Sequence, residues 1–293
     1  MRTLKTPAAL LLLLTAASTA TFAQWPDYPT PGPRGKDGKI DMAAPPPRTA
    51  DGKIDFSGLW EPARGAGSGR GGRGGGESMN GTKPLPYAIP TSPDDPPVGQ
   101  FFNIGAGLPG GLPPMTPWAT ALRAQRKADN NKDNPDALCE PLGLTQLHMH
   151  PQPRKIIQTP REIVVLYEAN GNTRDILTDG RGLPGTDPTP WFYGYSVAHW
   201  DGDTLVVETT GFRDDVWLDV EGSPLTNTGK MTERWRRLKF GLMQIDITIE
   251  DPKAYTKPFT VRVNHQLMPD TALMEFVCEE RDAKHYIGKD EKK

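Results

Sequence analysis

Residues 231–250 decide the fold, and they read MTERWRRLKFGLMQIDITIE. Methionine or isoleucine occupies every second position from 243 to 249, and Glu233 stands between Met231 and Trp235. Successive side chains of a β-strand point to opposite faces of the sheet, so a period of two indicates a strand with one buried face. The stretch therefore predicts two neighbouring strands, over 231–238 and 242–250, that face a common interior.

Seven further segments resemble these two. They are short, rich in β-branched and aromatic residues, and bounded by turn signals such as Asn170-Gly171 and Asp201-Gly202. They span residues 154–158, 162–168, 173–178, 192–200, 204–210, 258–268 and 272–279. So many strands in so short a span leave no room for crossover helices. We therefore expect a mainly all-β fold, an antiparallel meander over 155–280 that closes or nearly closes on itself.

The whole chain has 31 Gly and 31 Pro residues, and many of them lie in its first half. We therefore expect the first half to be largely irregular. Residues 24–52 form a Pro/Gly-rich extended segment, whose sequence Asp37–Asp41 recurs at Asp51–Asp55. The single β domain is expected over 53–281, with an irregular Gly/Pro-rich insertion over 64–115 and a polar tail over 282–293. One surface helix is predicted over 116–129, with Thr116 as N-cap and Pro117 at the first helical position.

The first 23 residues have the pattern of a secretory signal peptide. Arg2 and Lys5 precede an apolar run from Ala8 to Ala17, and small residues end the segment at Ala23. We expect cleavage near Ala23 and a periplasmic or secreted protein. No later stretch approaches the roughly 18 uncharged apolar residues that a membrane-spanning helix needs.

Charge and cysteine content narrow the class of protein. Without Arg2 and Lys5, 32 of the 34 basic residues remain against 36 acidic ones, a balance that favours neither nucleic acid nor an anionic membrane as partner. The two cysteines, Cys139 and Cys278, lack the spacing of a zinc or redox motif. In an oxidising compartment we expect them to form a disulfide.

Glu233 and His265 fall on faces that the alternation predicts to be buried. A buried carboxylate or imidazole is costly unless it is paired, so each is expected to have a partner or a ligand. Together they form a candidate catalytic acid–base pair, with Asp179 in support. The alternative is a structural ion pair between Glu233 and one of three arginines, Arg181, Arg234 or Arg236.

His148 and His150 would lie on one face of an extended segment, where they are candidates for zinc or copper ligands. A site needs three or four ligands, so the alternative is a pair of partly exposed histidines, and no metal or cofactor is expected.

The segment from Asp179 to Asp219 combines aromatic side chains with Asp and Arg, a mixture that suits a sugar or an aromatic ligand. The residues expected to line such a pocket are Arg181, Trp191, Tyr193, Trp200 and Trp217. The alternative is that the aspartates of the Asp-Gly pairs hold hairpin turns.

The chain resembles a large family of secreted proteins from Gram-negative bacteria that has no assigned activity. The motifs that carry the resemblance are Asp179-Gly-Arg181, Trp191, Gly194, Ser196, Trp200-Asp-Gly-Asp-Thr-Leu-Val-Val207, Thr210-Gly-Phe212, Trp217-Leu-Asp219, Thr232-Glu-Arg234, Asp251-Pro-Lys-Ala-Tyr-Thr-Lys-Pro258 and Cys278-Glu-Glu280. The chain departs from the family at Glu140 and at Gly222–Thr226. Gly58-Leu59-Trp60 is also similar to the opening strand of lipocalin-like barrels. The resemblance implies a calycin-like barrel, with a β-sandwich as the alternative.

Two functions remain open, and they need different sites. The first is an exported barrel that binds a small or medium ligand, a sugar or an aromatic compound. The second is an isomerase, lyase or hydrolase that uses Glu233 and His265. A structural role in the cell envelope is a further alternative. The sequence indicates neither the oligomeric state nor the ligand.

Overall fold

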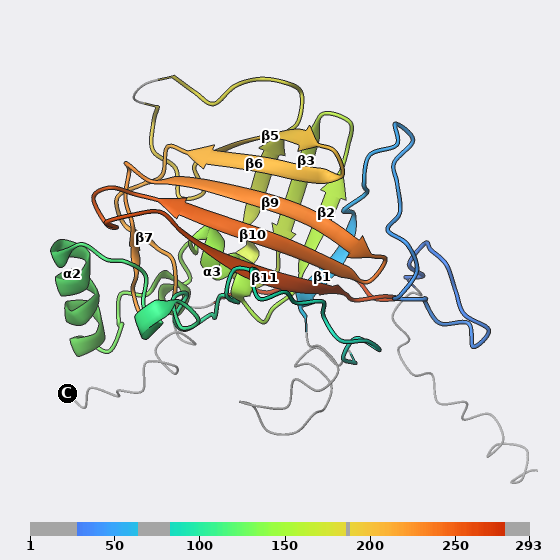
Figure 1. Cartoon of the computed structure of the whole chain (residues 1–293), viewed down its shortest axis with the longest axis horizontal. Coiled ribbons are helices and arrows are strands. Elements are labelled where there is room, and N and C mark those ends of the chain that lie inside the picture. The colour runs from blue at the N-terminus through green and yellow to red at the C-terminus, as the bar shows by residue number, and fades with distance from the viewer. Residues whose placement is uncertain (1–27, 64–82, 186–187, 279–293) are drawn as a thin grey trace, which may run out of the picture.

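Nine strands form a closed β-barrel in the computed structural model, which describes residues 28–63, 83–185 and 188–278 (Figure 1). Their order around the barrel is β1-β11-β10-β9-β6-β5-β4-β3-β2. The strands are β1 (Gly58–Pro62), β2 (Arg154–Gln158), β3 (Glu162–Tyr167), β4 (Thr173–Leu177), β5 (Tyr195–Asp201), β6 (Thr204–Thr210), β9 (Lys230–Lys239), β10 (Leu242–Glu250) and β11 (Phe259–Leu267). The barrel confirms the predicted all-β fold in place of the sandwich.

One junction of the barrel differs from the predicted antiparallel meander. β4 and β5 pair in parallel, through Ile176 with Ser196 and Leu177 with Val197, while every other neighbouring pair is antiparallel. β5 therefore begins beside the last residues of β4 and runs on in the same direction, so Leu177 and Tyr195 are not joined by a tight hairpin. Pro188 and Pro190 in this segment have no backbone N–H with which to pair along a strand.

The predicted strand over 272–279 was wrong for the residues that the structure describes, since positions 272–278 are not in a strand. β1 already occupies the place beside β11 and also pairs with β2, so the barrel has no free edge left. At Gly58, φ is 145°, a conformation that residues with a Cβ rarely adopt, and an added Cβ would also lie 2.7 Å from the end of the Leu267 side chain. Glycine is therefore required at the start of β1.

The predicted alternation of buried and exposed side chains is confirmed. Met243, Ile245, Ile247 and Ile249 of β10 are fully buried, and the same holds for alternate positions of β9 and β11. The interior is filled by large side chains, notably Trp60, Trp235 and Phe56. The barrel therefore encloses a packed core rather than an open channel.

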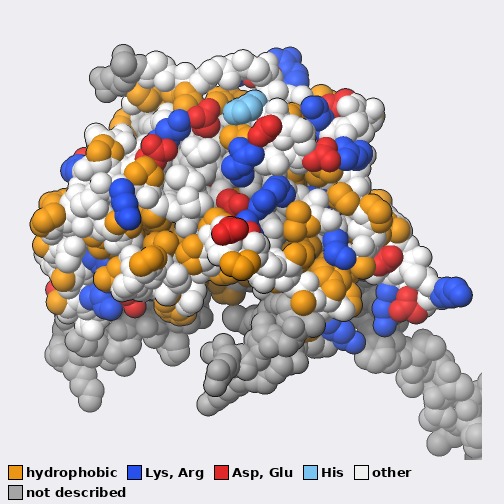
Figure 2. All heavy atoms as spheres, viewed as in Figure 1, with side chains coloured by type: hydrophobic (Ala, Val, Ile, Leu, Met, Phe, Trp, Pro, Cys, Tyr) orange, Lys and Arg blue, Asp and Glu red, His pale blue; other side chains and the backbone are white. Residues whose placement is uncertain are grey.

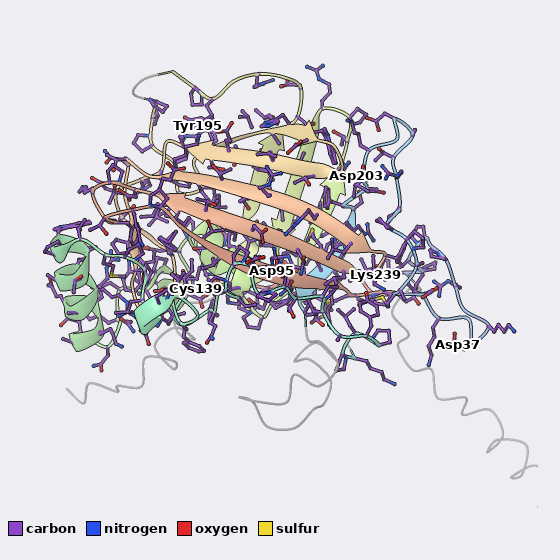
Figure 3. All side chains as sticks on the ribbon, in the orientation of Figure 1. Asp37, Asp95, Cys139, Tyr195, Asp203 and Lys239 are labelled. Carbon is purple, nitrogen blue, oxygen red and sulfur yellow. A yellow bond between two sulfur atoms is a disulfide. The ribbon has the colours of Figure 1, made fainter. Side chains whose placement is uncertain are left out.

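The repeated sequence of the N-terminal segment forms the same local structure twice. In each copy an arginine, Arg34 or Arg48, donates from Nη1 to the carbonyl oxygen four residues later, at 2.8 Å. The same two guanidinium groups bind carboxylates at 2.7 Å, Arg34 that of Asp270 and Arg48 that of Asp203. Asp203 lies at the edge of the barrel beside the N-terminal segment (Figure 3). The last isoleucine of each copy is buried in the core. The repeat is thus a docking unit that fastens the N-terminal segment to two turns of the barrel.

The predicted surface helix is confirmed as α2 (Pro117–Ala128), where the Thr116 hydroxyl accepts a hydrogen bond from the Ala119 amide at 3.3 Å. A second helix, α3 (Leu144–Met149), was not predicted. All six of its side chains are buried, polar ones included, so it has no exposed face and no alternation of buried and exposed positions to detect. Short elements complete the fold: η1 (Pro109–Gly111), η2 (Pro135–Leu138), η3 (Ala169–Gly171) and the pair β7 (Val216–Trp217) and β8 (Pro224–Leu225).

Cys139 and Cys278 form the predicted disulfide, with their Cα atoms 5.5 Å apart. No helix within the described ranges is long and apolar enough to cross a membrane. The predicted signal peptide, residues 64–82 of the predicted Gly/Pro-rich insertion and the polar tail lie outside the described residues. On the face shown in Figure 2, acidic and basic side chains are interspersed.

Candidate functional site

Glu233 lies at the centre of a polar cluster inside the barrel. His148 of α3 and Arg174 of β4 approach it from two sides, and none of the three is more than 1% exposed. The His148 Nε2 lies 2.7 Å from Glu233 Oε1, Arg174 Nη1 donates to the same oxygen at 3.2 Å, and Arg174 Nη2 binds Oε2. Trp235 Nε1 completes the set at 3.3 Å. Three donors thus meet at Oε1 and one at Oε2, so both oxygens of the buried carboxylate are hydrogen-bonded.

Neighbouring strands hold Arg174 in place. Its guanidinium donates to Ser196 Oγ of β5 at 3.1 Å and to Thr209 Oγ1 of β6 at 3.0 Å. These contacts join β4, β5, β6 and β9. They lie at the junction between β4 and β5, the only parallel pair among the described strands of the barrel. The ion pair therefore supports the part of the barrel with the fewest backbone pairs.

Arg154 and His265 form the second half of the cluster. Arg154 Nη1 donates to the backbone oxygen of His148 at 2.6 Å and lies 2.5 Å from His265 Nε2, while Nη2 donates to the backbone oxygen of His150 at 2.9 Å. These carbonyls belong to the C-terminal end of α3, where helices lack internal partners and favour a cation. We call Glu233, His148, Arg174, Arg154 and His265 together the barrel-core network.

The charge states within the network follow from burial and from the arginines. Burial alone would raise the pKa of Glu233, but the adjacent Arg174 and His148 lower it to about 2, so the carboxylate is ionised. Burial lowers the pKa of His148 against the opposing influence of Glu233. Burial, reinforced by Arg154, lowers the pKa of His265 well below its usual value. Both imidazoles are therefore neutral near pH 7, and His148 donates its Nε2 proton to Glu233.

The neutral His265 predicts a loss of stability in mild acid. Its pKa is lower in the folded than in the unfolded chain, so the unfolded chain takes up the additional proton below about pH 6.5. From pH 7 to pH 5 this group is expected to reduce the free energy of unfolding by about 2 kcal/mol. Urea titrations at both values, on the natural chain and on His265→Gln, measure the difference. Equal pH dependence in the two proteins would contradict the assigned charge state.

The predicted burial of Glu233 and His265 is confirmed, but the partner arginines are different ones. Arg234 binds Asp201, Arg236 binds Asp246 and Arg181 binds Asp179, all outside the barrel-core network. Arg174 and Arg154 were missed. The sequence could have indicated them. Each arginine stands two positions before a buried isoleucine of the same strand, so the two side chains lie on the same face of the sheet.

The histidine pair is not arranged as the extended segment predicted. His148 lies within α3 and His150 directly after it, where both are buried rather than partly exposed. His150 Nε2 lies 3.5 Å from Asp136, away from Glu233. Among the residues that the structure describes, no group of three or more His, Cys, Asp or Glu is placed to hold a metal ion.

The other predicted site residues are spread over the molecule. Asp179 is bound to Arg181 and does not reach Glu233. Trp200 stacks on Phe56 at 6.0 Å between ring centroids, and Tyr193 packs against the core. Two remain near a cavity: Trp191, which is 55% exposed, and the buried Trp217.

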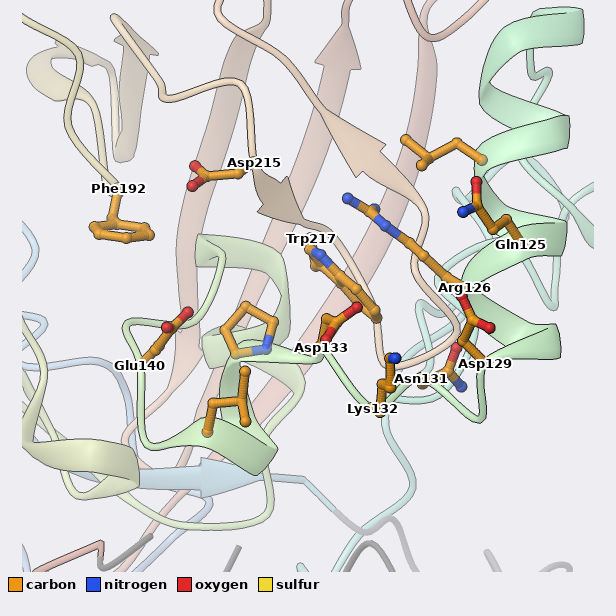
Figure 4. Close-up of a pocket in the computed structure, with 13 residues that line it drawn as sticks. Gln125, Arg126, Asp129, Asn131, Lys132, Asp133, Glu140, Phe192, Asp215 and Trp217 are labelled. Atoms are coloured by element: carbon orange, nitrogen blue, oxygen red, sulfur yellow. The ribbon is translucent and has the colours of Figure 1, made fainter.

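A cleft of about 400 Å³ opens between α2, the loop that follows it and β7 (Figure 4). Trp217 lies in its middle, with Phe192 and Glu140 to one side and Gln125 and Arg126 of α2 to the other. We call this the α2 cleft. Its lining residues are Leu122, Gln125, Arg126, Asp129, Asn131, Lys132, Asp133, Pro135, Leu138, Glu140, Phe192, Asp215 and Trp217.

Some polar side chains of the α2 cleft are already paired within the protein, and others are not. Arg126 stacks on the Trp217 ring at 4.2 Å and donates to the backbone oxygen of Gly222 at 2.9 Å, and burial lowers its pKa to about 10. Asp215 is paired with Arg213. Asp129, Asp133 and Glu140, in contrast, form no ion pair with any residue inside the described ranges. Their oxygens therefore remain available as acceptors.

A second cavity of about 370 Å³ adjoins the first. It is lined by Pro190, Arg213, Asp214 and Asp215, and Asp215 also lines the α2 cleft. We call it the Pro190 cavity. Neither cavity is lined by a member of the barrel-core network.

No family model, curated protein or solved structure matches this chain.

Proposed function

We propose that this protein is an exported carbohydrate-binding β-barrel whose site is the α2 cleft. The observation that carries the proposal is the lining of that cleft. Trp217 and Phe192 place aromatic rings in the lining, and a guanidinium group stacks on one face of each. Gln125 and Asn131 offer amide groups. The cleft is also lined by three carboxylates that form no ion pair within the described residues, those of Asp129, Asp133 and Glu140. Sugars present apolar C–H faces and edge hydroxyl groups, which such rings and polar side chains complement.

The chemistry of the cleft favours a neutral sugar over a purely aromatic ligand. Hydroxyl groups both donate and accept hydrogen bonds. Here they would donate to Asp129, Asp133 and Glu140 and would accept from the amides of Gln125 and Asn131. A flat hydrocarbon would instead leave these carboxylates desolvated and unpaired, which opposes binding.

We assign a structural role to Glu233 and His265 in place of acid–base catalysis. Both oxygens of Glu233 accept hydrogen bonds, Oε1 from His148, Arg174 and Trp235 and Oε2 from Arg174, and the carboxylate is fully buried. His265 contacts Arg154 and the backbone oxygen of His148, at 2.8 Å from the latter. The network fastens α3 to the strands of the barrel.

The family resemblance supports export, and the disulfide agrees with an oxidising compartment. We therefore place the binding site in the periplasm or outside the cell, where a barrel of this kind meets soluble sugars.

The α2 cleft predicts thermal stabilisation by sugars. At a concentration 100 times the dissociation constant, a ligand stabilises the folded state by about 2.7 kcal/mol, which corresponds to roughly 5 °C in melting temperature for a chain of this size. A panel of neutral hexoses, pentoses and N-acetylhexosamines tests this by differential scanning fluorimetry. If no sugar of the panel raises the melting temperature, the proposed function is wrong.

A pair of variants locates the site. Asp133→Asn removes a charged acceptor in the cleft and is expected to weaken binding about tenfold or more, since a hydrogen bond to a charged group contributes about 1.5–3 kcal/mol. Asp175→Asn is the matched control, because Asp175 is exposed on β4 and lines neither cavity. Unchanged affinity in Asp133→Asn would place the sugar elsewhere.

A further inference from the structure

We infer that the ligand is an oligosaccharide that extends from the α2 cleft through the Pro190 cavity to Trp191. This inference rests on the proposed function and adds the length of the ligand and a second group of contacts. The starting observation is that Asp215 lines both cavities, so the two lie next to each other on the surface, and a chain of sugar units could cross from one to the other.

The segment Pro190–Phe192 follows this path. Pro190 lines the second cavity and Phe192 lines the first, so the two ends of the tripeptide belong to the two halves of the site. Trp191 stands between them and is 55% exposed. The indole therefore presents a flat apolar surface beside a polar cavity, which is the combination that the face and the edge hydroxyl groups of a sugar unit complement.

Trp191 is held in place without being covered. Its ring stacks on Tyr195 at 4.6 Å with an interplanar angle of 28°. Its backbone N–H donates to Gly211 O at 3.0 Å, and its carbonyl accepts from the Arg213 N–H at 3.0 Å. The same segment that carries Arg213 and Asp215 therefore positions the ring, which leaves one face free for stacking by a sugar unit.

The charges along the second half of the path are paired. Arg213 binds Asp215 at 2.6 Å and stacks on Phe192 at 4.2 Å. Asp214 binds Lys253 at 3.2 Å and accepts from the Asn227 N–H at 3.0 Å. These paired side chains can form hydrogen bonds with a ligand while their charges cancel. This half of the site therefore suits neutral sugar units and excludes a strongly charged chain as the natural ligand.

The test is a titration by calorimetry with malto-, cello-, xylo- and chito-oligosaccharides of one, two, four and six units. In the series that binds, affinity is expected to increase at least tenfold from the shortest to the longest member. Trp191→Ala is expected to abolish that increase while the affinity for the shortest member stays unchanged, and Trp191→Tyr is expected to restore most of it.

The control is Trp118→Ala. Trp118 is 43% exposed and lies on α2, but it lines neither cavity. Affinity that depends on Asp133 but not on length or on Trp191 would overturn this inference and leave the proposed function standing. Absence of binding by every series would overturn both.

Discussion

Replacing Glu233 with alanine is expected to lower the free energy of unfolding by about 3–5 kcal/mol, because removal of one partner leaves a buried charge without compensation. Arg174 would keep its full charge inside the barrel, where the hydroxyls of Ser196 and Thr209 accept hydrogen bonds from it but carry no compensating charge. Equilibrium unfolding in urea, followed by tryptophan fluorescence, measures the change.

The matched control is Glu208→Ala. Glu208 of β6 pairs with Lys230 at 2.6 Å, but both side chains are at least 32% exposed, so a loss of about 0–1 kcal/mol is expected. The double variant Glu233→Ala with Arg174→Met should recover part of the loss, since it also removes the uncompensated cation. Equal losses for Glu233→Ala and Glu208→Ala would show that the network does not support the barrel.

Removal of the disulfide is expected to lower the free energy of unfolding by about 2–5 kcal/mol. The bond joins residues 139 positions apart, so it restricts the unfolded chain over much of its length. Urea unfolding of the natural protein, with and without a reducing agent, is compared with the variant that carries Cys139→Ser and Cys278→Ser.

The double serine variant also serves as the control for the reagent. It should unfold at the same urea concentration in both buffers and close to the reduced natural protein. A natural protein that unfolds at the same midpoint whether oxidised or reduced would refute the prediction.

Most of the barrel could be predicted because its strands have one buried and one exposed face. The period of two in β9, β10 and β11 indicated both the strands and their inner sides. The parallel junction between β4 and β5 could not be predicted, because it depends on the path of the irregular chain between Leu177 and Tyr195. α3 was missed because a helix buried on all sides has no periodic pattern.

The candidate site was less accessible to prediction than the fold. Burial of Glu233 and His265 followed from alternation, but Arg154 and Arg174 were overlooked, because arginine is rarely buried unless it is paired. Trp217 was the only predicted ligand-binding residue that lines the α2 cleft. The remaining lining comes mainly from α2 and the loop after it, whose proximity to β7 is a tertiary feature without a local sequence signal.

The closing position of β1 has a consequence for the way the barrel forms. β1 pairs with β11, and its Glu61 bonds to Gln266 across a separation of 205 residues. Contacts between residues so far apart in the sequence require a large loss of chain entropy before they stabilise the fold, so they form slowly. The seam beside β1 is therefore expected to assemble last, only after β11 is available. It is also the place where the finished barrel would first come apart.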